Sequence, residues 1–160
     1  DVYEDFLCPH CADFNKTVKP QLYEEYIKTG KVRYVYHTFP LGGFEPGASV
    51  AANAALCAAD QNQFWQMHDQ LFAMQSQGMN AYSLPSLIKV GEAMGLNRGE
   101  FSACMNSYKY RNEILSTISQ GAALGVGGTP TVFANGTLVA NGADYTVLKA
   151  EVDKLLASGG

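Results

Sequence analysis

A segment of helical length between two strand-like segments constrains this fold more than any other feature. Residues 1–7 and 31–39 are rich in β-branched and aromatic side chains, as strands usually are. Between them, residues 9–28 carry apolar side chains at helical spacing; we expect Pro20 to kink this helix and Gly30 to end it. Strands joined by such a helix are expected to pair in parallel through a right-handed crossover.

The rest of the chain is predicted as a long helical stretch followed by a hairpin and a last helix. Residues 46–124 have a helical pattern with breaks that define four or five helices. Two strand-like runs, 130–134 and 137–140, flank Asn135-Gly136, a dipeptide that accepts the positive φ angles of a type I′ turn. The last helix is predicted from about residue 145 to residue 157.

This order of elements predicts an α/β protein with a thioredoxin-like fold, β-α-β then β-β-α, and an inserted helical domain. We assign residues 1–45 and 125–160 to the thioredoxin-like domain and residues 46–124 to the helical insertion. At 160 residues and 47% hydrophobic, the chain is long enough to bury a core and does not require two independent domains.

Charge and hydropathy exclude several classes of partner. The chain has 11 Lys plus Arg against 15 Asp plus Glu, so no basic surface for nucleic acid or anionic lipid is expected. No apolar run approaches the roughly 18 to 20 residues of a membrane helix. Because the sequence begins at Asp1 inside a strand-like run, we expect an upstream segment, such as a signal peptide or anchor, to have been removed or left out.

The run Cys8-Pro9-His10-Cys11 has the chemistry of a redox pair. Two cysteines three apart at a helix start lie one turn apart and can close a small disulfide ring. Cys8 faces the unpaired N–H groups and the positive end of the helix dipole, which favour a thiolate. Pro9 suits the first helical position because that position needs no N–H donor, and His10 can add a positive charge.

Stabilising this thiolate has a consequence for the redox potential, because the reduced form carries the thiolate and the disulfide does not. A fall in the pKa of Cys8 from ~8.5 to ~5 would be worth roughly 60 mV at pH 7 for a two-electron couple. A shift of this size separates an oxidase from a reductase.

Zinc binding is the main alternative interpretation of the cysteine pair. A structural zinc site needs about four ligands, and the chain has neither a second Cys-X-X-Cys run nor a pair of histidines at ligand spacing. His37 and His68 are isolated and are predicted to be structural or exposed. We therefore predict no metal and no cofactor.

Three motifs give the chain a resemblance to the DsbA family. They are Tyr3-Glu4-Asp5-Phe6-Leu7-Cys8-Pro9-His10-Cys11, Phe39-Pro40-Leu41, and Gly127-Gly128-Thr129-Pro130-Thr131-Val132-Phe133. The resemblance spans essentially the whole chain, including the helical stretch. It implies that Cys8 is the nucleophile that forms the mixed disulfide with substrate and that Cys11 is the buried resolving thiol.

The resemblance also implies a function, a location and partners. The expected activity is that of an extracytoplasmic thiol:disulfide oxidase that introduces disulfides into reduced, unfolded exported proteins. The expected partner for reoxidation is a membrane protein of the DsbB or VKOR type. The protein is expected to be a monomer in the periplasm or another extracytoplasmic compartment, where an upstream segment is one possible anchor.

The resemblance implies a further role for Thr129 and Pro130, a cis peptide bond whose loop faces Cys8. Without the resemblance, a proline opening a strand is equally well explained as an ordinary edge-strand start. In the family-based interpretation, the backbone of Thr129 pairs with an extended substrate, and the Thr129 hydroxyl can donate to the thiolate.

The chain departs from the family pattern in one position. Members of the superfamily often carry a buried acid six residues before the nucleophile, where this chain has Val2. Glu4 lies on the same strand face and is a candidate for proton handling, but an exposed carboxylate is the simpler expectation for it.

Cys57 and Cys104 remain after Cys8 and Cys11 are paired. Both lie on predicted helices of the insertion among apolar neighbours, so they could meet in one core. Two free buried thiols are the alternative, while an oxidising compartment favours a structural disulfide. Some DsbA-like proteins carry a second disulfide in this region.

Three other functions stay open from the sequence. A reductase or isomerase would share the chemistry, although an isomerase of this superfamily usually brings a dimerisation domain that this chain does not contain. A DsbA-like glutathione-dependent isomerase or transferase typically lacks the paired cysteines. A non-catalytic interaction module is the third, and an assay of dithiol oxidation distinguishes it from the enzymes.

Overall fold

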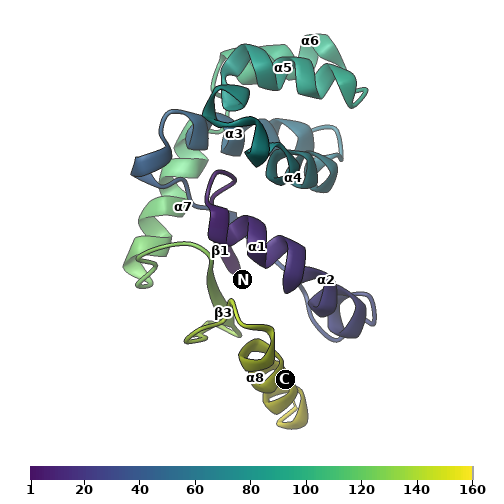
Figure 1. Cartoon of the computed structure of the whole chain (residues 1–160), viewed down its shortest axis with the longest axis vertical. Coiled ribbons are helices and arrows are strands. Elements are labelled where there is room, and N and C mark those ends of the chain that lie inside the picture. Colours follow the sequence, from purple (N-terminus) through teal and green to yellow (C-terminus); the bar gives the residue numbers. More distant parts are fainter. Residues whose placement is uncertain (160) are drawn as a thin grey trace.

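A four-stranded mixed sheet organises the computed structural model, which describes residues 1–159 (Figure 1). Its strands are β1 (Val2–Glu4), β2 (Tyr36–Thr38), β3 (Thr131–Ala134) and β4 (Thr137–Leu138), in the order β2-β1-β3-β4. β1 and β2 pair in parallel, whereas β1 with β3 and β3 with β4 pair antiparallel. The parallel pair predicted for the β-α-β unit is therefore confirmed, and so is the thioredoxin-like fold.

The second strand is shorter than the sequence predicts. Residues 31–35 are extended but are not part of the sheet, which begins where Val2 lies opposite Tyr36. The N–H of Val2 donates to the carbonyl of Val35 at 2.9 Å, and within residues 1–159 no further strand pairs with the segment before it. β-rich composition alone does not make a strand without a partner.

The crossover helix is broken, as Pro20 predicts. It consists of α1 (Pro9–Thr17), α2 (Lys19–Leu22) and the π-helical turn η1 (Tyr23–Ile27). The break between α1 and α2 lies just before Pro20, whose ring nitrogen has no hydrogen to donate to the preceding turn. Gly30 follows with a φ of 74°, the left-handed conformation that often ends a helix.

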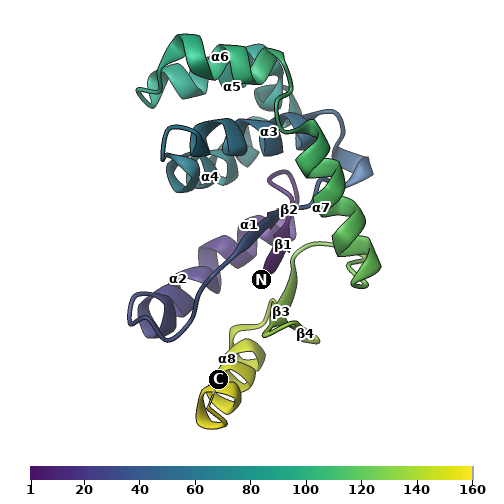
Figure 2. The same cartoon turned by 180° about the vertical axis from the view of Figure 1, so that it is seen from behind.

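Helices cover both faces of the sheet. On one face, Val2 and Val132 pack against α1, α2 and the last helix, α8 (Tyr145–Ala157). On the other face, Tyr3 and Phe133 lie under α7 (Arg111–Ala123). Figure 2, the view from behind, shows α7 running past the sheet. A Cβ atom on Gly121 would lie 2.7 Å from the Phe39 ring, so glycine permits this close approach of α7.

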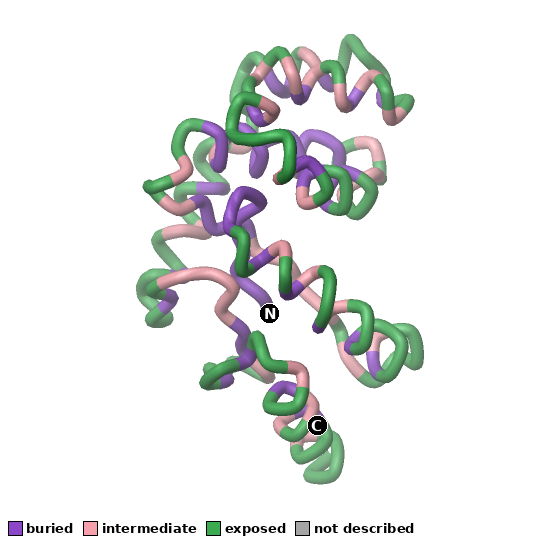
Figure 3. The backbone as a smooth tube through the Cα atoms, viewed as in Figure 1, coloured by how far each residue is buried: buried purple, intermediate pink, exposed green. Residues whose placement is uncertain are grey.

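The segment between β2 and β3 is helical, with five α-helices and three short 3₁₀ turns in the described residues. The elements are η2 (Gly42–Phe44), α3 (Gly47–Ala59), α4 (Phe64–Ala73), η3 (Met74–Gln77), η4 (Met79–Tyr82), α5 (Leu84–Ala93), α6 (Arg98–Asn106) and α7. The alanine-rich α3 lies at the centre of the segment and is mostly buried (Figure 3). Its small side chains let neighbouring helices approach. The division into two domains at these boundaries stays a prediction.

The hairpin and the last helix follow the sequence prediction closely. Asn135 and Gly136 have φ angles of 46° and 78°, as a type I′ turn requires. β4 ends at Leu138 rather than residue 140, and Asn141, with a φ of 56°, turns the chain towards α8. No helix within residues 1–159 combines the length and the apolar character needed to cross a bilayer.

Candidate active site

Cys8 occupies the junction between the sheet and the crossover helix. It is the N-cap of α1, with extended φ and ψ of −74° and 122°, and Pro9 follows at the first helical position. The Cys8 carbonyl accepts hydrogen bonds from the N–H groups of Cys11 and Ala12, each at 3.1 Å. The sulfur of Cys8 thus lies beside a helix start, where unpaired N–H groups concentrate positive potential.

The cis-proline loop lies against this sulfur. The peptide bond between Thr129 and Pro130 is cis, and the Cys8 thiol donates to the carbonyl oxygen of Thr129 at 3.4 Å. The Thr129 hydroxyl is buried without a hydrogen-bond partner in the described residues. Since that hydroxyl can rotate towards a thiolate, the loop holds a spare donor for the ionised sulfur.

Hydrogen bonds lower the pKa of Cys8 to about 5. The largest contribution is the hydrogen bond from the Cys11 thiol; burial opposes it, and the Thr129 hydroxyl and the backbone N–H groups of Cys11 and His10 lower the pKa further. The His10 side chain is exposed, and the role of its imidazole charge stays a prediction.

Cys11 has the opposite electrostatic environment. Its side chain is fully buried, and burial, the adjacent Cys8 and the charge of Glu4 raise its pKa. Both cysteines are free thiols here. The pair is therefore asymmetric, with one sulfur that ionises easily and one that keeps its proton.

Glu4 is buried, and the expectation that it would be exposed was wrong. It shares its strand face with Val2, and α1 and α2 cover that face. One carboxylate oxygen accepts from the Tyr34 hydroxyl at 2.9 Å, and the other accepts from the amide of Asn15. Asn15 also donates to the Cys11 carbonyl at 2.9 Å. Burial raises the pKa of Glu4 to about 7.

Asp5 is a buried acid that the sequence analysis did not select. Its carboxylate accepts from the N–H of Leu7 at 2.8 Å and from the N–H of Leu41 at 2.7 Å. Burial raises the pKa of Asp5 to about 6. An acid three residues before Cys8 was the available signal, because aspartate often accepts from the N–H two residues on and so fixes a turn.

Cys57 and Cys104 lie away from this junction, on α3 and α6. They form a disulfide with a Cα–Cα distance of 5.9 Å. His37 contacts Asp1, and His68 is fully buried beside Asp69, each at 2.8 Å. Within residues 1–159, no group of three or more potential ligands is arranged to hold a metal ion.

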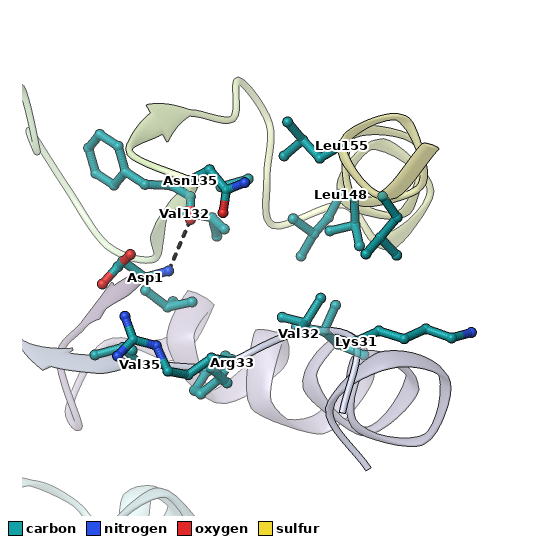
Figure 4. Close-up of a pocket in the computed structure, with 16 residues that line it drawn as sticks. Asp1, Lys31, Val32, Arg33, Val35, Val132, Asn135, Leu148 and Leu155 are labelled. Carbon is teal, nitrogen blue, oxygen red and sulfur yellow. Dashed lines mark hydrogen bonds between the residues drawn. The ribbon is translucent and has the colours of Figure 1, made fainter. Parts of the chain in front are cut away.

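Two cavities border residues 32–34. One, of about 260 Å³, lies between α8 and residues 31–35; Figure 4 shows Leu148 and Leu155 facing Val32 across it. The larger, of about 920 Å³, is lined by α1, α2 and α4 and reaches Asn15 and Tyr34, the two residues that hold Glu4.

A thioredoxin-like sheet with a polarised Cys-X-X-Cys pair at a helix start and a cis-proline loop beside it defines a thiol:disulfide oxidoreductase. A family model described as "Thioredoxin" matches residues 1–154, and the chain belongs to this family.

Relatives and solved structures agree with this assignment. The chain is 30% identical over 157 residues to a protein of Bacillus anthracis named "Probable disulfide bond formation protein D", covering 96% of this chain and 71% of that protein. The oxidised BdbD structure from Bacillus subtilis is similar, with a TM-score of 0.85 and 21% identity over 98% of this chain and 85% of that chain. Wolbachia pipientis alpha-DsbA1 gives 0.82 and 23%, covering 98% and 84%.

Proposed function

We propose that this protein is an oxidase that introduces disulfide bonds into exported proteins through Cys8 and Cys11. The observation that carries the proposal is the depressed pKa of the Cys8 thiol, about 5, beside a Cys11 thiol whose pKa is raised. A stabilised thiolate favours the reduced form of the enzyme, so the oxidised form readily gives up its disulfide.

The reaction follows from the asymmetry of the two sulfurs. A substrate thiolate attacks the Cys8 sulfur of the Cys8–Cys11 disulfide, a mixed disulfide forms, and Cys11 leaves and takes up a proton. A second substrate thiolate then attacks the substrate sulfur of the mixed disulfide, and Cys8 leaves as the stabilised thiolate. The substrate loses two electrons and gains a disulfide, and the enzyme retains both electrons as a dithiol.

We assign substrate docking to the loop that contains Thr129 and Pro130. Pro130 has no N–H, so the carbonyl and N–H of Thr129 are the backbone groups available to an extended peptide that adds to this edge. The 3.4 Å contact between the Cys8 thiol and the Thr129 carbonyl supports this role, because a peptide paired with Thr129 has its own cysteine beside the Cys8 sulfur.

Glu4 is our candidate for the group that exchanges the proton of Cys11. Its buried carboxyl has a pKa of about 7 and is linked to the Cys11 carbonyl through Asn15. A neutral-range pKa lets a carboxyl both give and take a proton near neutral pH. The larger cavity reaches Asn15 and Tyr34, which supports proton exchange between Glu4 and solvent on that side.

The cycle needs an oxidant that removes two electrons from the dithiol. We propose that a membrane reoxidase of the DsbB or VKOR type fills this role, and that the reaction takes place outside the cytoplasm, where disulfides persist. The substrates in this proposal are reduced, unfolded exported proteins.

A redox titration against glutathione tests the proposal. An oxidase is expected near the ~−120 mV of DsbA, whereas a value near the ~−270 mV of thioredoxin would identify a reductase. The same sample should oxidise a dithiol peptide stoichiometrically, and a Cys8→Ser variant should not. Failure of the wild-type protein to oxidise the peptide would leave a non-catalytic binding role as the better explanation.

A further inference from the structure

A side chain from the helical insertion binds the backbone of the turn that carries Cys8. The Nε2 group of Gln75, on η3, donates to the carbonyl of Phe6 at 2.8 Å and to the carbonyl of Cys8 at 3.0 Å. Gln75 is separated from Cys8 by 67 residues. The side-chain amide of Gln75 has two hydrogens to donate, and both of its hydrogen bonds go to carbonyls of this turn.

We propose that Gln75 is a positioning residue that sets the pKa and the redox potential of Cys8. The inference rests on the proposed role of Cys8 and assigns part of its control to the helical insertion. Gln75 does not need to contact substrate. It acts through the orientation and the local potential of the Cys8 backbone.

Two physical effects connect Gln75 to the sulfur. The Cys8 carbonyl also accepts from Cys11 and Ala12, so it starts the helix, and a further donor fixes the direction in which the first-turn N–H groups point. In addition, the carbonyls of Phe6 and Cys8 place partial negative charge near the sulfur. The amide of Gln75 offsets that charge, which otherwise disfavours a thiolate.

Asp5 completes the support from the other side. It binds the N–H of Leu7 through its side chain and the N–H of Cys8 through its carbonyl, at 2.8 and 3.1 Å. The donors of the turn are thus held from within the thioredoxin-like part, whereas two of its carbonyls are held by Gln75. A displacement of η3 would therefore alter the hydrogen bonds to the carbonyls of Phe6 and Cys8, whereas the hydrogen bonds that Asp5 accepts do not involve η3.

A charge-ordered series of substitutions at Gln75 tests the proposal. Gln75→Lys keeps donors and adds positive charge, Gln75→Met keeps the length and removes the donors, and Gln75→Glu replaces them with negative charge. The midpoint pH for alkylation of Cys8 should increase in the order Lys, Gln, Met, Glu. Gln75→Met should also lower the equilibrium constant for oxidation of reduced glutathione by the Cys8–Cys11 disulfide by about threefold or more.

Gln77 provides the matched control. It lies on the same short helix, is exposed, and takes part in none of the side-chain hydrogen bonds found within residues 1–159. Gln77→Met, Gln77→Lys and Gln77→Glu should leave the alkylation midpoint within error of wild type.

The outcomes separate this inference from the proposed function. If the wild-type midpoint is depressed but the Gln75 series shifts only the free energy of unfolding, Gln75 is merely structural and the inference fails. A wild-type midpoint close to that of an ordinary thiol, ~8.5, defeats the oxidase proposal instead. Should Gln75→Met not fold, the lysine and glutamate variants, which differ in the sign of their charge, still decide the order.

Discussion

The thiol of Cys8 donates to the carbonyl oxygen of Thr129 across 3.4 Å, although 121 residues separate the two in sequence. The thiolate environment therefore combines an N-terminal helix start with a C-terminal loop. We expect alkylation of the reduced protein to titrate with a midpoint at about pH 5, the pKa of Cys8. Rates measured across pH by mass spectrometry give this value directly, since Cys11 has a raised pKa and Cys57 and Cys104 are bonded.

Removing the Thr129 hydroxyl should raise the pKa of Cys8. In Thr129→Val, the hydroxyl that helps lower the pKa of Cys8 is lost while the shape is kept. The alkylation midpoint should increase, and the protein should become a weaker oxidant. Thr137→Val, on the exposed strand β4, is the control. An unchanged midpoint in Thr129→Val would mean that the hydroxyl stays away from the sulfur.

The stability of the reduced protein should depend on pH with a definite sign. The pKa of Cys8 is about 5 in the folded protein and ~8.5 for an unfolded thiol, so the folded state stabilises the thiolate. This contribution is fully present above ~8.5 and is lost as the pH decreases through about 5. The oxidised form has no Cys8 thiolate, so the reduced form should have the larger free energy of unfolding at pH 8. Denaturant unfolding of both forms at pH 8 and pH 5 should show this difference becoming smaller at the lower pH.

Glu4→Gln should remove a pH dependence from the step in which Cys11 leaves or attacks. The pKa of Glu4 is raised to about 7, so the carboxyl changes its charge as the pH passes from 6 to 8, and a glutamine cannot. We expect the rate of mixed-disulfide formation from the oxidised enzyme, the step in which Cys11 leaves, to lose its inflection near pH 7 in this variant. Asp13→Asn, an exposed change on α1, should keep it. Identical pH profiles for Glu4→Gln and wild type would exclude Glu4 as the proton carrier.

The disulfide between Cys57 and Cys104 should stabilise the fold without affecting the redox site. It joins α3 to α6 across 47 residues, and a loop of this length corresponds to about 4 kcal/mol at most, with about 2 to 4 kcal/mol typical. The double variant Cys57→Ala, Cys104→Ala should lose free energy of unfolding in this range. Its Cys8 alkylation profile should match wild type; a shifted profile would indicate that the bond influences the site.

Local patterns in the sequence were sufficient for most of the fold. The type I′ turn at Asn135-Gly136 and the kink at Pro20 depend on neighbouring residues alone, and both are present. Residues 31–35 were misassigned because a strand also needs a partner, and partners are set by register rather than by composition.

The candidate site could be predicted only in part. The Cys8 helix start follows from four adjacent residues, whereas the burial of Glu4 depends on which face of β1 the helices cover. Side chains alternate between the two faces of a strand, so Glu4 shares a face with the apolar Val2, and this was the signal for its burial. The contact of Gln75 with Cys8 has no local signal, because it arises only when the insertion packs against the turn.

The pairing of β1 with β3 has a consequence for the order of events during synthesis. Val2 pairs with Val132, and the amino group of Asp1 donates to the Phe133 carbonyl at 3.0 Å, so the first strand meets residues translated more than a hundred codons later. Chains emerge from the ribosome N-terminus first. Until residues 129–134 have emerged, Cys8 lacks the Thr129 hydroxyl, one of the groups that lower its pKa in the folded protein. The environment that stabilises the Cys8 thiolate is therefore complete only after nearly the whole chain has been made.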